Sequence, residues 1–213
     1  MNTLRALLSG LMLMTLQILP FPAIAETAVP QTLPALQQQL SDTRALTGSF
    51  TQIRELKLLS KPLVSRGSIY YQKDTGICWQ LTSPVAASVY LTRDKVSVAD
   101  SASSSTTTTA NPLLQAFSHL LFAVFAGDLA MLEHQFDVTM TPESSGWQLT
   151  LLPENSLMSS VAESIKVTGS SAIKTVKLFH PGGDSTTLSF SDILLNPGAI
   201  PPALTCHHAD SPA

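Results

Sequence analysis

Three short segments in the first half of the chain constrain its fold more than any other feature. They span residues 48–52, 67–71 and 77–84. In the third segment, apolar residues alternate with Cys78, Gln80 and Thr82, which is the period-two pattern of a half-buried antiparallel strand. The residues between the first two segments, 56–63, are too apolar for an ordinary solvated loop. A sheet with one apolar face needs a cover, and the nature of that cover is the functional question.

Two helices are expected near this sheet. The first begins at Thr32, with Leu36, Leu40 and Leu46 near helical spacing. The second spans residues 112–126 between an N-cap at Asn111 and a stop at Gly127. One apolar stripe runs along the second helix, flanked by Leu114 and Phe125, and consists of Leu113, Phe117, Leu120, Leu121 and Val124. From residue 113 to 126 the second helix contains no Asp, Glu, Lys or Arg. A helix that covers an ordinary sheet usually shows a charged outer face. The second helix is therefore expected to lie across the concave side of the sheet.

Most of the remaining chain consists of strand-length segments bounded by turn residues: 85–91, 95–99, 136–141, 146–152, 164–168, 173–179 and 186–190. Residues 101–109 are almost purely Ser and Thr and are predicted to be a mobile loop. Short helical pieces are expected at 128–134 and 157–161. The pattern predicts an α+β protein with an open or partly closed, strongly curved antiparallel sheet of about ten strands.

The N-terminus predicts export. Arg5 precedes an uncharged apolar run, and the A-x-A sequence at 23–25 predicts cleavage of a signal peptide, residues 1–25, after Ala25. An uncleaved membrane anchor is the alternative, but the apolar run is shorter than the ~20 residues of a span. We expect a soluble, monomeric protein in the periplasm, with one domain over residues 26–195 and a Pro-rich, poorly ordered tail over 196–213.

Composition argues against several classes of partner. The net charge is −3, and it becomes more negative once Arg5 is removed, so a nucleic-acid ligand is not expected. The same charge argues weakly against electrostatic adhesion to an anionic membrane. Charged residues make up only 13% of the chain and its mean hydropathy is +0.22. That is more apolar surface than a compact core of this size needs, as expected if some of it lines a cavity.

Neither catalytic nor metal-binding motifs are found, and no cofactor is expected. Ser118 and His119 are adjacent on the predicted helix and point about 100° apart, so they do not form a catalytic pair. We therefore expect no enzymatic activity. The cysteines, Cys78 and Cys206, are either joined by a disulfide, which export permits, or remain two separate thiols.

Three motifs resemble a known family. Phe-x-Gln at 50–52, Gly-x-Ile-x-Tyr at 67–71 and Trp-x-x-x-x-Pro at 79–84 occur in the order seen in the outer-membrane lipoprotein carrier (LolA) family and its divergent LolA-like branches. The resemblance continues through residues 111–136 and 147–190. It implies a periplasmic half-barrel with a helical lid that holds acyl chains in its concavity. It also implies an inner-membrane exporter that supplies the cargo and an outer-membrane acceptor that receives it.

The resemblance and the apolar pattern together predict the residues that line a lipid-binding cavity. They are Phe50, Trp79, Leu81, Val89, Leu113, Phe117, Leu120, Leu121, Val124, Trp147, Leu149, Leu188 and Phe190. The same residues would form an ordinary core in a β protein without a ligand, so this interpretation stays open here.

One departure from the family concerns closure of the lid. Well-known members have an Arg immediately before the strand Trp, and its hydrogen bonds tie the sheet to the lid, whereas Cys78 stands there in this chain. A lid is thus expected to close and open differently, and the cargo is either a lipoprotein or another exported lipid. The alternatives are a non-carrying envelope interaction or sensor module with the same half-barrel and, less favoured, a hydrolase.

Overall fold

All strands in the described part of the chain belong to one antiparallel sheet. The computed structural model describes residues 29–92, 96–100, 106–109 and 112–198, and for residues 99–100, 106–109 and 112–117 it describes the backbone only. The strands are β1 (Ala45–Glu55), β2 (Leu63–Gln72), β3 (Gly76–Ser83), β4 (Ala87–Leu91), β5 (Val96–Asp100), β6 (Thr106–Thr109), β7 (Phe136–Glu143), β8 (Gly146–Pro153), β9 (Ser164–Gly169), β10 (Ile173–Phe179) and β11 (Ser185–Leu195).

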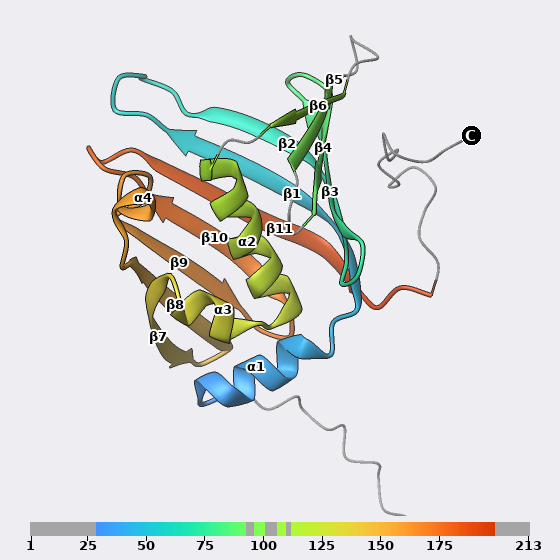
Figure 1. Cartoon of the computed structure of the whole chain (residues 1–213), viewed down its shortest axis with the longest axis vertical. Coiled ribbons are helices and arrows are strands. Elements are labelled where there is room, and N and C mark those ends of the chain that lie inside the picture. Colours follow the sequence, from blue (N-terminus) through green and yellow to red (C-terminus); the bar gives the residue numbers. More distant parts are fainter. Residues whose placement is uncertain (1–28, 93–95, 101–105, 110–111, 199–213) are drawn as a thin grey trace, which may run out of the picture.

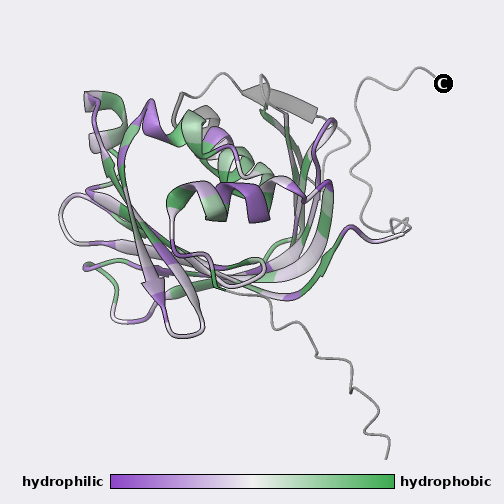
Figure 2. Cartoon of the chain, turned by 90° about the horizontal axis from the view of Figure 1, so that it is seen from below, coloured by the Kyte–Doolittle hydropathy of each residue, from purple (hydrophilic) through white to green (hydrophobic). Residues whose placement is uncertain are grey.

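The strand order β6-β5-β4-β3-β2-β1-β11-β10-β9-β8-β7 divides the sheet into two meanders. Strands β1–β6 form one half and β7–β11 the other, and the halves join where β1 pairs with β11, with Phe50 opposite Phe190. The edge strands β6 and β7 do not pair, so this eleven-stranded sheet is not closed into a barrel. Figure 2 shows its strong curvature. The prediction of an open, curved antiparallel sheet of about ten strands is confirmed.

The described helices are α1 (Leu33–Ser41), α2 (Pro112–Ala126), α3 (Leu129–Glu133) and α4 (Ser156–Ser159). Thr32 caps α1, as predicted, and its hydroxyl accepts a hydrogen bond from the Ala35 N–H. The connection from edge strand β6 to edge strand β7 runs through α2 and α3, and it places α2 across the concave side of the sheet (Figure 1). The predicted position of this helix is confirmed.

The core lies between the concave face and α2. Every residue from 120 to 126 is buried, so this part of α2 is enclosed on all sides. The sequence pattern predicted one apolar stripe with flanking positions, whereas the helix lies within the concavity of the curved sheet (Figure 2) and buries the residues off the stripe as well. A helix that is apolar all round needs such an enclosure.

Three local predictions need correction. Residues 106–109, predicted as part of a mobile loop, form β6 and pair with β5, because a run of Thr suits an edge strand. Leu46, assigned to the first helix, lies in β1. Asn196, assigned to the poorly ordered tail, has a φ of 48°, accepts hydrogen bonds from the N–H groups of Arg44 and Ala45, and donates one to the Asp42 carbonyl. The signal peptide (1–25), residues 101–105 and most of the tail (199–213) lie outside the described residues.

Gly127 fixes the junction between α1 and α2. Its φ is +68°, and a Cβ atom there would lie 2.6 Å from the Ser41 nitrogen and 2.8 Å from the Leu40 Cβ. We expect Gly127→Ala to lower the free energy of unfolding by about 2–4 kcal/mol, because backbone strain and overpacking add. Gly182→Ala is the matched control, since Gly182 also has a positive φ but its Cβ would meet no atom within 4 Å. Equal losses for the two variants in chemical denaturation would contradict the close-packing argument.

Candidate functional site

Aromatic side chains from four central strands meet on the concave face. Phe50 of β1 and Trp79 of β3 have ring centroids 4.0 Å apart, and Trp79 contacts Phe190 of β11 edge to face at 6.3 Å. Phe125 of α2 packs against Phe190 at 5.8 Å and against Tyr71 of β2 at 5.6 Å. The strand register explains the cluster, because paired residues such as Phe50 and Phe190 point to the same face.

In each half of the sheet an aromatic ring covers a glycine of the neighbouring strand. A Cβ at Gly67 would lie 2.8 Å from the Phe50 ring, and a Cβ at Gly169 would lie 2.9 Å from Cε2 of Trp147. The Trp147 Nε1–H also donates a hydrogen bond to the Ser170 carbonyl oxygen at 2.7 Å. The glycines therefore let two large rings lie flat within the concave layer.

The structure brings most of the predicted cavity residues into one interior. The buried ones are Phe50, Trp79, Leu120, Leu121, Val124, Trp147, Leu149, Leu188 and Phe190. Leu81 and Val89 are partly buried against the same core. Leu113 and Phe117 lie on α2, at positions whose side chains are outside the described part of the chain. Because α2 fills the concavity, these residues contact one another, and their contact with a lipid remains a prediction.

The predicted cavity residues omitted three members of the aromatic cluster: Tyr71, Phe122 and Phe125. Tyr71 is fully buried, and Phe122 of α2 contacts it edge to face at 6.2 Å between ring centroids. The alternation of Gly67, Ile69 and Tyr71 along β2 could have placed Tyr71 on the concave face. Phe122 had no such signal, because it lies off the stripe that the helical period defines.

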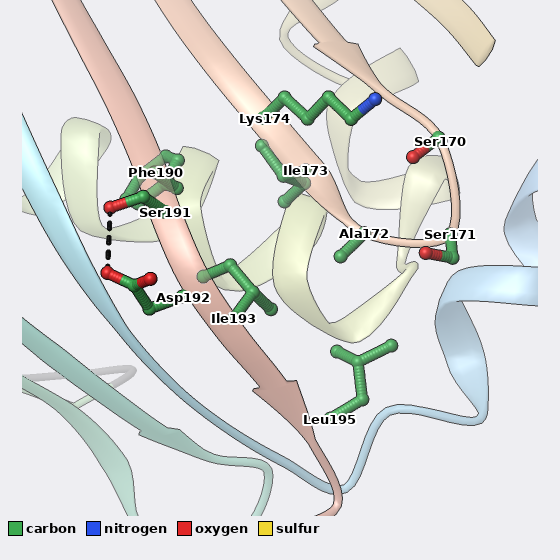
Figure 3. Close-up of a pocket in the computed structure, with 10 residues that line it drawn as sticks. All are labelled: Ser170, Ser171, Ala172, Ile173, Lys174, Phe190, Ser191, Asp192, Ile193 and Leu195. Atoms are coloured by element: carbon green, nitrogen blue, oxygen red, sulfur yellow. Dashed lines mark hydrogen bonds between the residues drawn. The ribbon is translucent and has the colours of Figure 1, made fainter. Parts of the chain in front are cut away.

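A surface pocket of about 260 Å³ lies between β10 and β11, and Phe190 is one of its lining residues. Figure 3 shows its lining, formed by Ser170, Ser171, Ala172, Ile173, Lys174, Phe190, Ser191, Asp192, Ile193 and Leu195. The pairing of β10 with β11 begins only at Thr175, opposite Ser189, which leaves this space beside the preceding residues. The pocket is slightly smaller than the roughly 300–1,000 Å³ of typical ligand sites.

Cys78 does not occupy a lid-latch position. It lies opposite Tyr70 and Tyr90 in the strand register, whereas its neighbour Trp79 contacts Phe50 on the concave face. Successive side chains of a strand alternate between faces, so Cys78 points to the convex side, away from α2. Residue 78 therefore does not face α2, and the expectation that a lid closes differently without the family arginine stays a prediction. Burial along β3 also departs from the predicted alternation of apolar and polar positions. Cys78 is as well buried as Trp79, with 3% of its surface exposed.

Burial affects the ionisation of the two tyrosines opposite Cys78. Burial raises the pKa of Tyr70. Burial also raises the pKa of Tyr90, and the nearby Tyr70 charge adds to that rise. The two tyrosines that lie opposite Cys78 in the register are thus themselves partly withdrawn from solvent.

Cys78 is disulfide-bonded, and the described part of the chain contains no free cysteine. The pairing with Cys206 stays a prediction, because Cys206 lies outside the described residues. The chain leaves β11 near Leu46, three strand spacings (about 15 Å) from β3, and the residues from 196 to 206 could extend over roughly 30 Å.

We expect denatured, unreduced protein to show no titratable thiol, and reduction to lower the free energy of unfolding by about 2–4 kcal/mol. Such a bridge would tie the tail to the convex face, because that is the face to which Cys78 points. Two thiols before reduction would exclude the bridge.

Polar groups near the core have structural partners. His180 Nδ1 lies 2.7 Å from the Val161 carbonyl oxygen, and Nε2 lies 2.8 Å from Thr186 Oγ1. His119 is half-buried on α2. The described residues contain no group of three or more His, Cys, Asp or Glu side chains that could hold a metal ion. None of the helices described has both the length and the hydrophobicity of a membrane span.

Comparison with known proteins identifies the family. The model of the family described as outer membrane lipoprotein carrier protein LolA matches residues 41–201, about three quarters of the chain. The chain therefore belongs to the LolA family, and the resemblance seen in the sequence motifs is confirmed. LolA-like families consist of carrier and binding proteins rather than enzymes. No curated protein matches the chain in sequence.

Several solved structures share the fold. An uncharacterized conserved protein from Thermus thermophilus aligns with a TM-score of 0.51 and 8% identity over 84% of this chain and 96% of its own. A LolA superfamily protein from Nitrosomonas europaea aligns with a TM-score of 0.43 and 10% identity over 83% and 99%. The Mycobacterium tuberculosis lipoprotein LppX gives 0.42 and 11% over 79% and 99%. At these identities, the Thermus likeness supports the fold alone.

Proposed function

We propose that this protein is a periplasmic carrier that holds the acyl chains of its cargo on the concave face of the sheet, in the space that α2 fills. The observation that carries the proposal is the burial of residues 120–126 of α2, a helix without charged side chains, inside a sheet that is not closed. An uncharged apolar helix and an acyl chain make the same kind of contact with the surrounding side chains. An acyl chain can therefore replace α2 against the concave face.

The energetics of such an exchange favour reversible binding. Removing apolar surface from water contributes about 25 cal/mol per Å² whether the partner is a helix or a lipid chain. Displacing α2 loses its contacts with the sheet, and the cargo regains contacts of similar size. The difference between the two states stays small, as a carrier that must release its cargo requires. No covalent chemistry is involved.

The open sheet offers routes for the cargo. The edge strands β6 and β7 are unpaired with each other, and the pocket between β10 and β11 leads from the surface to Phe190. An acyl chain that enters there would meet the aromatic cluster first. Release of α2 would then extend the site toward Trp79 and Leu149.

Membership of a lipoprotein carrier family supports a position between two membranes. In this proposal an inner-membrane exporter loads the protein and an outer-membrane acceptor unloads it. The cargo is either the acylated end of a lipoprotein or another exported lipid. Both have acyl chains, and the apolar interior does not distinguish them.

Native mass spectrometry of delipidated protein incubated with envelope lipid tests the proposal. A stoichiometric lipid complex is the expected result. A mass without lipid, together with a stable protein partner, would favour the interaction or sensor module instead. Turnover of an acyl ester would show an enzyme.

A further inference from the structure

The connection between β1 and β2 exposes leucines at one end of the sheet. Leu58 is 97% exposed, Leu59 47% and Leu63 48%. By composition, residues 56–63 are too apolar for an ordinary solvated loop, yet most of them are exposed to solvent in the structure. We call residues 56–63 the leucine loop.

The base of the leucine loop is fixed to the sheet. The backbone N–H of Lys57 donates a hydrogen bond of 2.9 Å to the Asp184 carboxylate, in the turn between β10 and β11. The Leu59 N–H bonds to the Leu56 carbonyl oxygen at 2.9 Å and closes a turn. The exposed leucines therefore stand on the end of a long, anchored hairpin, which Figure 1 shows projecting from the sheet.

The charge of the leucine loop is opposite to that of the whole protein. Lys57 and Lys61 are exposed within it, and the loop contains no acidic residue. Two carboxylates lie at the base of the loop and keep their charge there, Glu55 accepting a hydrogen bond from Ser185 at 2.7 Å and Asp184 accepting the one from the Lys57 N–H. A protein with a net charge of −3 thus carries a local cationic, leucine-rich tip.

We propose that the leucine loop docks on the surface of an anionic lipid bilayer, an inference that rests on the carrier function proposed above. The leucines would enter the boundary between headgroups and acyl chains, and the two ammonium groups would contact lipid phosphates. Leu157 of α4 is 48% exposed, and α4 lies at the same end of the sheet (Figure 1). A carrier docked in this way holds its cargo site close to the membrane it exchanges with.

Charge complementarity favours a bilayer over a protein as the occupant. Two lysines interspersed among leucines match a surface that presents phosphates above hydrocarbon. The overall negative charge keeps the rest of the molecule off the same surface, so only the tip engages. This docking replaces the expectation, drawn from net charge alone, that the protein avoids anionic membranes.

Sedimentation with vesicles tests the docking. The purified protein should bind phosphatidylglycerol vesicles at low salt and bind phosphatidylcholine vesicles much more weakly. The double variant Leu58→Ser/Leu59→Ser should lower the partition coefficient roughly tenfold. Lys57→Gln and Lys61→Gln should each lower it about fivefold, an effect that added salt removes.

Leu194→Ser is the matched control, because Leu194 is 63% exposed at the opposite end of β11 and should leave binding unchanged. Wild-type protein that ignores anionic vesicles, loop variants that bind like wild type, or an equal loss in Leu194→Ser would each overturn the docking. A loop-dependent complex with a membrane protein but not with vesicles would also overturn it. Lipid retention without vesicles is measured in parallel: its absence in wild-type protein rejects the carrier function, while loop-dependent vesicle binding stands on its own.

Discussion

Replacing Trp147 with alanine is expected to lower the free energy of unfolding by about 3–5 kcal/mol, a large share of the total for a single domain. Trp147 is fully buried, its ring lies over Gly169, and its Nε1–H donates to the Ser170 carbonyl. The glycine cannot fill the space that the ring leaves. Truncation therefore creates a cavity as well as losing apolar contacts.

Equilibrium denaturation in urea measures this effect, and two further variants define its origin. Leu152→Ala should change stability by less than about 0.5 kcal/mol, because Leu152 is 46% exposed on the other face of β8. Trp147→Phe should cost less than Trp147→Ala, since Gln39 still donates a hydrogen bond to the Ser170 carbonyl at 2.6 Å. A Trp147→Ala loss as small as that of Leu152→Ala would mean that the concave layer is loosely packed.

Placing a carboxylate inside α2 is expected to abolish lipid retention while most of the sheet stays folded. Leu120 is 2% exposed, and an unpaired charge at its position costs several kcal/mol unless the group reaches water. Detachment of α2 provides that route, because the strand ladders do not include the helix. Leu120→Glu should thus melt cooperatively at a lower temperature and show no stoichiometric lipid in native mass spectrometry.

Ala130→Glu is the control for added charge, since Ala130 is exposed on the neighbouring α3. It should retain both lipid and stability. If Leu120→Glu fails to fold at all, α2 is an inseparable part of the core, and the exchange of helix for cargo is ruled out. If Leu120→Glu retains lipid as wild type does, the cargo does not bind under α2.

Local patterns predicted the elements whose signals are contiguous. Alternation and turn residues located most strands, and the absence of charge together with Gly127 located α2 and its end. The edge strand at 106–109 was not predicted, because its stability comes from pairing with β5 rather than from its own composition. The face of Cys78 was predictable, because the period-two pattern places it opposite Trp79, but its burial was not, because the pattern assigned Cys78 to the less apolar face of the strand.

The candidate site was predictable in part. The concave residues of β8 and β11 follow the strand period, so Trp147, Leu149 and Leu188 could be placed together in advance. Phe50 and Phe190 were predicted to line the same cavity, but their direct pairing could not be predicted, because it depends on contact between the first and last strands. Local sequence patterns do not distinguish an ordinary hydrophobic core from a lipid-binding cavity, because both need the same apolar side chains.

The pairing of β1 with β11 also has a consequence for how the molecule forms. Each meander consists of hairpins between strands close in sequence, and such local contacts form early. The ladder that joins the meanders links opposite ends of the domain and carries the highest loop-closure entropy. The concave chamber can therefore be completed only after β11 has emerged from synthesis or translocation. Until then the two halves remain separate hairpin assemblies with their apolar faces exposed, so folding of this domain is governed by its last strand.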